Sequence, residues 1–234
     1  MSERNSALHR RARERGVNPI VYWVVRAFFQ PFFHLYFRLS RIGREHIPDG
    51  PVIFAANHRS FLDPFIIGTM SRRPLYYVAK EELFAKRLQA WFLNSLGAFP
   101  VSRGNGDKDT IETAKAILAR GDSVLIFPEG TRRPPGAPPA YKYGVAHLYQ
   151  NLGFPCVPIA MNSGLYWPRR QFIRRPGTVR IEVQDPIAPG LGREAFFKLV
   201  QERIETASNR LLEEGRAELG MGPASPSETS LSKV

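Results

Sequence analysis

The sequence predicts an α/β fold: a single domain with a central mixed or mostly parallel sheet flanked by helices, preceded by a pair of N-terminal helices. Three observations support this prediction. The chain has 234 residues, enough for one sizeable domain but too few for two. Hydrophobic residues make up 43% of it, which suits a chain that folds around its own core. From Pro51 onward, short apolar runs alternate with amphipathic stretches, the pattern of an α/β domain.

The expected elements follow from this alternation, because short apolar runs predict strands and longer amphipathic segments predict helices. Strands are expected over residues 52–56, 75–79, 98–101, 123–127, 156–161 and 178–183. Helices are expected over residues 64–70, 82–95, 109–119, 144–151 and 193–214. Residues 132–139 hold four prolines and a glycine, which predicts a loop. The domain should therefore span residues 41–216, and the Ser-, Pro- and Gly-containing residues 217–234 should form a disordered tail.

Two segments precede this domain. Residues 1–16 form a basic arm with five arginines, and residues 17–40 are apolar and aromatic. No small-residue cleavage site follows, so a signal peptide is not expected. A single membrane crossing would keep the arginines in the cytoplasm but export the domain. Helix starts at Asn18-Pro19 and Gln30-Pro31 instead predict two short helices in the membrane interface, on the cytoplasmic face. The alternative is a hydrophobic helix packed in the core.

The charge and the cysteine content restrict the partners. A formal net charge of +12 and a pI of about 10.2 indicate an anionic partner, which can be nucleic acid, anionic lipid or a phosphorylated substrate. Charge alone does not choose among them. The single cysteine, Cys156, excludes an internal disulfide and a multi-cysteine zinc site. It lies in an apolar segment, which favours core packing over a role as nucleophile.

The most informative segment is Asn57-His58-Arg59-Ser60-Phe61-Leu62-Asp63, which follows the strand expected at 52–56. Asp63 precedes a proline, so a helix is expected to begin at Pro64. With the segment in a turn, the Asp63 carboxylate can fold back onto the His58 imidazole. That contact would fix the tautomer and leave the far ring nitrogen free as a base. The alternative is a loop histidine and a carboxylate that only caps the helix; the spacing does not separate the two.

A second cluster, residues 127–133, follows another expected strand, and ligands bind at the carboxyl ends of strands in open α/β sheets. Gly130 lets the backbone approach a ligand, Thr131 offers a hydroxyl, and Arg132 offers a planar fork suited to phosphate. Glu129 can either hold an arginine in place or bond a substrate hydroxyl. An ordinary surface turn is the alternative interpretation.

A third cluster places Arg103 just after the strand expected at 98–101. Lys80 follows the strand expected at 75–79 and is either a further phosphate ligand or a surface lysine. The remaining histidines are scattered along the chain, so no metal site is expected. The chain thus combines a candidate base with cationic side chains at several strand ends.

These motifs resemble those of the glycerolipid acyltransferase family, the group that contains bacterial lysophosphatidate acyltransferases. The family's first motif, Asn-His followed by four residues and Asp, is matched by Asn57, His58 and Asp63. The third, Phe-Pro-Glu-Gly-Thr-Arg, is matched letter for letter from Phe127 to Arg132. The looser second and fourth motifs are matched by Phe99, Val101 and Arg103, and by Val157, Pro158 and Ile159. Pro100 departs from the usual aliphatic residue.

The resemblance implies transfer of a fatty acyl group from acyl-CoA or acyl carrier protein to a hydroxyl of 1-acyl-glycerol-3-phosphate, giving phosphatidic acid for phospholipid biosynthesis. Glycerol-3-phosphate and a lyso-aminolipid are the alternative acceptors. In this interpretation His58 is the base and Asp63 stabilises its imidazolium, while Arg103 and Arg132 hold the acceptor phosphate. Neither a cofactor nor a metal is expected, and the thioester is a co-substrate.

The rival class is a non-catalytic protein that binds membranes or nucleic acid through its basic, aromatic surface. Such a protein needs no His–Asp pair, and it leaves the string from Phe127 to Arg132 unexplained. We therefore expect an enzyme whose partners are a membrane lipid, an acyl thioester and an anionic membrane surface, with no nucleic acid.

Overall fold

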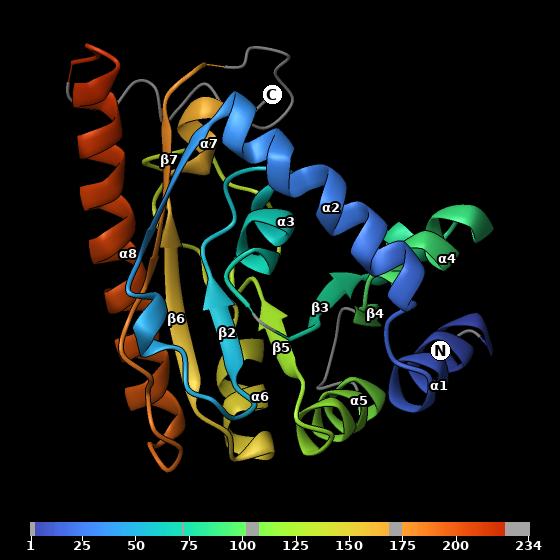
Figure 1. The fold of residues 1–234 in the computed structure, drawn as a ribbon. Coiled ribbons are helices and arrows are strands. Elements are labelled where there is room, and N and C mark those ends of the chain that lie inside the picture. Colours follow the sequence, from blue (N-terminus) through green and yellow to red (C-terminus); the bar gives the residue numbers. More distant parts are fainter. Residues whose placement is uncertain (1–2, 72, 102–107, 169–174, 223–234) are drawn as a thin grey trace.

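The computed structural model describes residues 3–71, 73–101, 108–168 and 175–222, which form one seven-stranded sheet with helices on both faces (Figure 1). The strands are β1 (Arg38–Ile42), β2 (Ile53–Ala56), β3 (Leu75–Lys80), β4 (Ala98–Val101), β5 (Ser123–Ile126), β6 (Cys156–Met161) and β7 (Thr178–Val183). The helices are α1 (Glu3–Glu14), α2 (Pro19–Tyr36), α3 (Asp63–Gly68), α4 (Arg87–Ser95), α5 (Lys108–Ala119), α6 (Gly144–Leu152), α7 (Ser163–Tyr166) and α8 (Arg193–Glu218). Two 3₁₀ turns, η1 (Arg44–His46) and η2 (Glu81–Phe84), complete the described elements.

The strand order is β1-β7-β6-β2-β5-β3-β4. The five strands from β6 to β4 run parallel to one another, β7 runs antiparallel to β6, and β1 pairs parallel with β7. The predicted mixed, mostly parallel sheet is therefore confirmed. Because the carboxyl ends of β2, β3, β4, β5 and β6 meet at one edge, the loops that follow them converge there.

Strand β2 shows why the core has two layers. All four of its side chains are buried, as befits a central strand covered on both faces. Phe54 and Ala56 face a cluster that includes parts of α2, α3 and α7, whereas Ile53 and Ala55 face a cluster built with α1, α5, α6 and α8. The alternation follows from the two-residue period of a strand.

The N-terminal segments differ from their prediction. A pair of helices is present, but the break expected at Gln30-Pro31 is wrong, because α2 runs unbroken from Pro19 to Tyr36 with Pro31 inside it. Packing holds both sides of the proline in one helix: Phe33 is buried, and Phe29 stacks on Phe65 of α3 at a centroid distance of 4.2 Å. The Asn18 side chain caps the helix by accepting from two amides, so the predicted start is confirmed.

The domain also begins earlier and ends later than expected. Strand β1 occupies residues assigned to the apolar segment; as an edge strand that is nowhere fully buried, it lacks a hydrophobic pattern. Helix α1, within the basic arm, packs on the domain through Leu8, His9 and Ala12. At the other end, α8 extends to Glu218, past residue 214 where the helix was expected to end and past residue 216 where the domain was expected to end. Helix α1 of the basic arm therefore packs in the same hydrophobic core as the sheet.

One face of α2 is left open. Its exposed side chains are Ile20, Trp23, Val24, Phe28, Leu35 and Tyr36. The Arg26 guanidinium lies 5.5 Å from the centroid of the Trp23 ring. It donates to the backbone oxygens of Gly68 and Ser71 at 2.8 and 3.2 Å, which ties α2 to the end of α3. Over the described ranges, no helix has the length and apolar content needed to cross a membrane.

Candidate active site

The site lies at the carboxyl edge of the sheet, where β2 and β5 end side by side. Their register pairs Ala55 with Ile126, so the two loops leave the sheet at the same level. The backbone amide of His58 donates to Glu129 Oε2 at 3.2 Å, and the amide of Arg133 donates to the His58 carbonyl at 2.8 Å. The segment from Asn57 to Asp63 and the cluster at residues 127–133 are therefore hydrogen-bonded to each other.

His58 and Asp63 form a direct pair. His58 Nδ1 lies 2.9 Å from Asp63 Oδ2, and the imidazole stacks on the Phe127 ring at a centroid distance of 4.1 Å. The Asp63 side chain is fully buried, while that of His58 is 18% exposed. An ionised Asp63 requires the Nδ1–H tautomer, which leaves Nε2 as the free base. The arrangement can accept a proton from a group placed against the open side of the ring.

Asp63 is held more firmly than the sequence indicated. Its Oδ2 also accepts from the backbone amides of Arg59 and Ser60 at 2.7 and 2.8 Å, and Oδ1 accepts from Ser163 Oγ at 2.5 Å. Helix α3 begins at Asp63 rather than at Pro64, and its N-cap is Leu62. The alternative in which Asp63 only caps the helix is thus wrong, because its carboxylate bonds the turn that precedes it.

Asn57 locks the base of this turn. Its buried amide donates to the Met161 carbonyl and to Ser208 Oγ, and its oxygen accepts from the Met161 amide, all at 2.8 Å. These contacts join β2 to the end of β6 and to α8. Nothing local in the sequence reveals Ser163 or Ser208 as partners, since they lie 100 and 151 residues away from the groups that they bond.

Glu129 is turned inward. Only 2% of the residue is exposed. Its Oε1 lies 2.9 Å from Nη1 of Arg59, and the two form an ion pair whose geometry is not that of a hydrogen bond. Burial raises the pKa of Glu129 to about 7, although Arg59 and the His58 amide both favour the ionised form. This placement corresponds to holding an arginine.

Arg59 was not singled out from the sequence, yet it links three elements. Its Nη2 lies 3.5 Å from Glu205 Oε1 on α8, and the same oxygen accepts from the Tyr141 hydroxyl at 2.9 Å. Burial and the neighbouring Glu205 raise the pKa of Tyr141, which keeps it a hydrogen-bond donor. Two carboxylates thus compensate the buried guanidinium, as a charge in a protein interior requires.

The rest of the second cluster forms a tight turn. Gly130 has a φ of +62°, a conformation that favours glycine, and its amide donates to the Phe127 carbonyl at 2.9 Å. Thr131 and Arg132 follow and are half-buried. Lys142 covers the turn: a Cβ added to Gly130 would lie 3.1 Å from its Nζ. Lys142 is a cation that the sequence did not single out, because the proline-rich loop separates it from the motif.

The other predicted cations lie on neighbouring strands. Lys80 is half-buried at the end of β3, where it pairs with Val101 of β4. Arg103 lies outside the described residues. Cys156 is at the amino end of β6, the opposite edge of the sheet, and burial raises the pKa of its thiol. Among the described residues, no group of three His, Cys, Asp or Glu side chains forms a metal site.

Comparison with known proteins agrees with these motifs. The model of a family described as Acyltransferase matches residues 38–162. A 1-acyl-sn-glycerol-3-phosphate acyltransferase from Pseudomonas aeruginosa is 33% identical over 175 residues, 73% of this chain and 68% of that protein. A lyso-ornithine lipid O-acyltransferase of the same organism is 38% identical over 85 residues, 36% of this chain and 32% of that protein. The chain spans about half the length of the plant and algal relatives that it matches.

A solved structure shows the same fold. The crystal structure of the 1-acyl-sn-glycerophosphate (LPA) acyltransferase, PlsC, from Thermotoga maritima is 26% identical and superposes with a TM-score of 0.66. The match covers 86% of this chain and 82% of that chain. The family match includes β1, which supports counting that strand as part of the domain. The His58–Asp63 pair, the turn from Phe127 to Arg132 and these comparisons together show that the chain belongs to the acyltransferase family and is an O-acyltransferase of lipid biosynthesis.

Proposed function

We propose that the chain transfers a fatty acyl group from an acyl thioester to the free hydroxyl of 1-acyl-glycerol-3-phosphate, giving phosphatidic acid. The observation that carries the proposal is the His58–Asp63 pair, with Nδ1 bound at 2.9 Å and the imidazole partly open to solvent. The names of the relatives from Pseudomonas aeruginosa and Thermotoga maritima support this acceptor.

In the proposed reaction, His58 Nε2 takes the proton of the acceptor hydroxyl as its oxygen attacks the thioester carbonyl. The tetrahedral intermediate collapses, the C–S bond breaks, and the imidazolium returns the proton to the leaving thiolate. Asp63 stabilises the imidazolium between these steps. Cys156 is buried at the other edge of the sheet, so direct attack in a ternary complex is favoured over an acyl-enzyme.

The acceptor phosphate is proposed to bind the cations after β5 and its neighbouring strands. Arg132 and Lys142 lie at the turn that contacts His58. Lys80 is the last residue of β3, and Arg103 comes two residues after β4 in the sequence. A guanidinium offers paired donors for phosphate oxygens, whereas an ammonium acts as a point charge. The donor is acyl-CoA or acyl carrier protein, both of which carry phosphate.

The exposed face of α2 is proposed to lie in the membrane interface, on the cytoplasmic side. Its large side chains are 43–89% exposed, and this contiguous apolar face is typical of membrane or protein contact. An aromatic chain connects it to the site, because Phe29 of α2 stacks on Phe65, whose ring lies 5.9 Å from that of Phe61 in the His58 loop. A lipid acceptor would thus reach His58 from the membrane side.

A second acceptor is favoured by one observation, the 38% identity to a lyso-ornithine lipid O-acyltransferase. One assay separates the candidates: the purified protein is offered lysophosphatidate, glycerol-3-phosphate or lyso-ornithine lipid with the same acyl thioester, first as the CoA ester and then on acyl carrier protein. We expect the highest kcat/KM with lysophosphatidate and no transfer by His58→Ala. Preference for another acceptor would overturn the proposed substrate, and transfer by His58→Ala would overturn the proposed base.

A further inference from the structure

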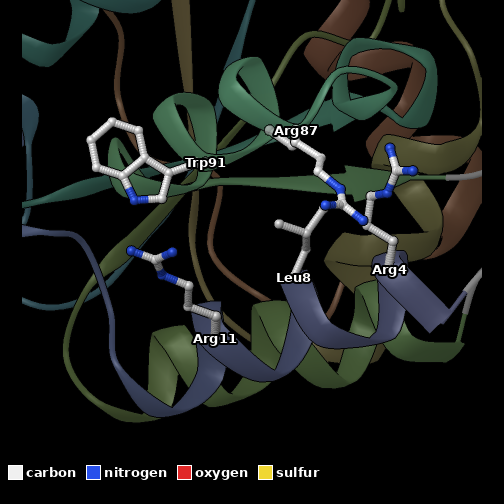
Figure 2. Close-up of a pocket in the computed structure, with 6 residues that line it drawn as sticks. Arg4, Leu8, Arg11, Arg87 and Trp91 are labelled. Atoms are coloured by element: carbon white, nitrogen blue, oxygen red, sulfur yellow. The ribbon is translucent and has the colours of Figure 1, made fainter.

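A pocket of about 350 Å³ lies between α1 and α4, away from the motifs of the active site. Its lining consists of Arg4, Leu8 and Arg11 from α1 and Arg87, Ala90 and Trp91 from α4. Figure 2 shows Arg4, Leu8 and Arg11 pointing from α1 toward α4, while Arg87 points back toward α1. No residue of the His58 or Glu129 clusters lines it.

The helical period explains why these side chains meet. On α1 the lining residues stand at positions 4, 8 and 11, and on α4 at positions 87, 90 and 91. Positions three or four apart lie on the same face of a helix, so each set lines one face. The apolar floor is formed by Leu8 and Ala90, which are 9% and 4% exposed. The Trp91 ring, 45% exposed, forms one wall. The result is a cationic pocket with an apolar base.

The charge of the pocket is not compensated within the described part of the chain, where no carboxylate lies within 4.0 Å of its three guanidinium groups. Arg4 donates to the carbonyls of Phe84 and Ala85, and Arg11 Nη2 lies 3.4 Å from Ser95 Oγ. Each guanidinium has five N–H groups, so most donors remain available. Like charges held together in this way favour a bound anion.

We propose that this pocket binds the phosphate group of an anionic membrane phospholipid, as a site separate from the one that binds the reacting acceptor. The surroundings favour a lipid over a soluble anion: Leu88, Trp91 and Phe92 on α4 are 78%, 45% and 38% exposed. Helix α2, which also exposes large apolar side chains, contacts α4. A tryptophan beside arginines is the pairing found where a protein surface meets headgroups and acyl chains.

The test compares two matched variants of the full chain. Arg11→Gln with Arg87→Gln removes two charges from the pocket and keeps Arg4, which bonds η2. Arg193→Gln with Lys198→Gln removes the same charge from α8, which packs on β6 and β7 at the other end of the sheet from β4 and the pocket (Figure 1). Each protein is sedimented with phosphatidylcholine vesicles and with vesicles that also contain phosphatidylglycerol. Acyl transfer in detergent micelles confirms that each variant is folded.

We expect the pocket variant to bind the anionic vesicles about 30-fold more weakly than the unmodified protein, because each arginine near such a surface contributes about fivefold. The α8 variant should bind nearly as well as the unmodified protein, and binding to neutral vesicles should change little. Equal losses in the two variants would mean that only net charge matters, and this would overturn the site. Binding of inorganic phosphate that only the pocket variant loses, together with equal vesicle binding by the two variants, would assign the pocket to a soluble anion instead. Since transfer in micelles is measured separately, failure of this proposal is distinguishable from failure of the proposed function.

Discussion

The substitution Asp63→Asn separates the charge of Asp63 from its structural role. In the native site, Oδ2 accepts from His58 Nδ1, the Arg59 amide and the Ser60 amide, while Oδ1 accepts from Ser163 Oγ. Because two backbone amides face the Oδ2 position, the oxygen of an asparagine must take that place. Its NH₂ group then donates to the Ser163 hydroxyl, which can also act as an acceptor. Every hydrogen bond is kept, and so is the Nδ1–H tautomer of His58.

What the variant loses is the negative charge beside the imidazolium. Two unit charges about 4 Å apart interact by about 4 kcal/mol at an effective dielectric constant of about 20, which corresponds to roughly 1000-fold in rate. The two amide donors already offset part of the Asp63 charge. We therefore expect kcat to fall by about 100-fold to 1000-fold, with little change in KM for the acceptor.

The assay measures thiol release from acyl-CoA with lysophosphatidate, together with thermal unfolding. Asp63→Ala is the comparison, because it leaves the amides of Arg59 and Ser60 without an acceptor and costs about 1–3 kcal/mol of stability for each. Asp63→Asn should unfold close to the wild-type temperature and Asp63→Ala well below it. A rate for Asp63→Asn within about tenfold of the wild type would refute the assigned role of the charge.

Two further predictions concern the neighbouring loops. Burial raises the pKa of Glu129 to about 7 from its ordinary value of 4.5, so the folded state binds the proton more tightly than the unfolded state. The free energy of unfolding should consequently fall by about 3 kcal/mol as pH rises through this interval. Glu129→Gln should remove that slope in urea titrations, and an unchanged slope would contradict the shift. Lys142→Gln should raise KM for lysophosphatidate about tenfold while kcat changes little. Lys115→Gln, an exposed change on α5, is its control, and a loss confined to kcat would contradict phosphate binding.

The parts of the site that the sequence predicted are those fixed by local geometry. His58 and Asp63 are five residues apart, and a turn closed by Pro64 suffices to bring them together. Asn57 and Arg59 lie in the same string, but their partners Ser208 and Glu205 belong to α8. Such long-range pairs depend on how α8 packs against the sheet, and no local spacing reveals them.

In the fold, too, the elements with a local sequence pattern were predicted and those that depend on long-range packing were not. Six strands were found from the sequence because their apolar runs are buried, and β4, β6 and β7 have the predicted bounds. Strand β1 was missed since an edge strand with two arginines carries no such pattern. The helix expected at 82–95 is divided into η2 and α4, which lets Phe84 and Ala90 reach the same apolar cluster. Tertiary packing overrides local preference in each case.

The order of the strands bears on which cation meets the acceptor phosphate. In 1-acyl-glycerol-3-phosphate only a few bonds separate the reacting oxygen from the phosphorus, so the phosphate must bind close to His58. Arg132 belongs to the loop after β5, the strand next to β2, and its neighbour Arg133 bonds the His58 carbonyl. Lys80 is the last residue of β3, two strands from β2 and therefore about 10 Å away along the sheet. We infer that Arg132 and Lys142 are better placed than Lys80 to hold that phosphate, and that Lys80 suits a group farther from the reacting hydroxyl, such as a phosphate of the acyl donor.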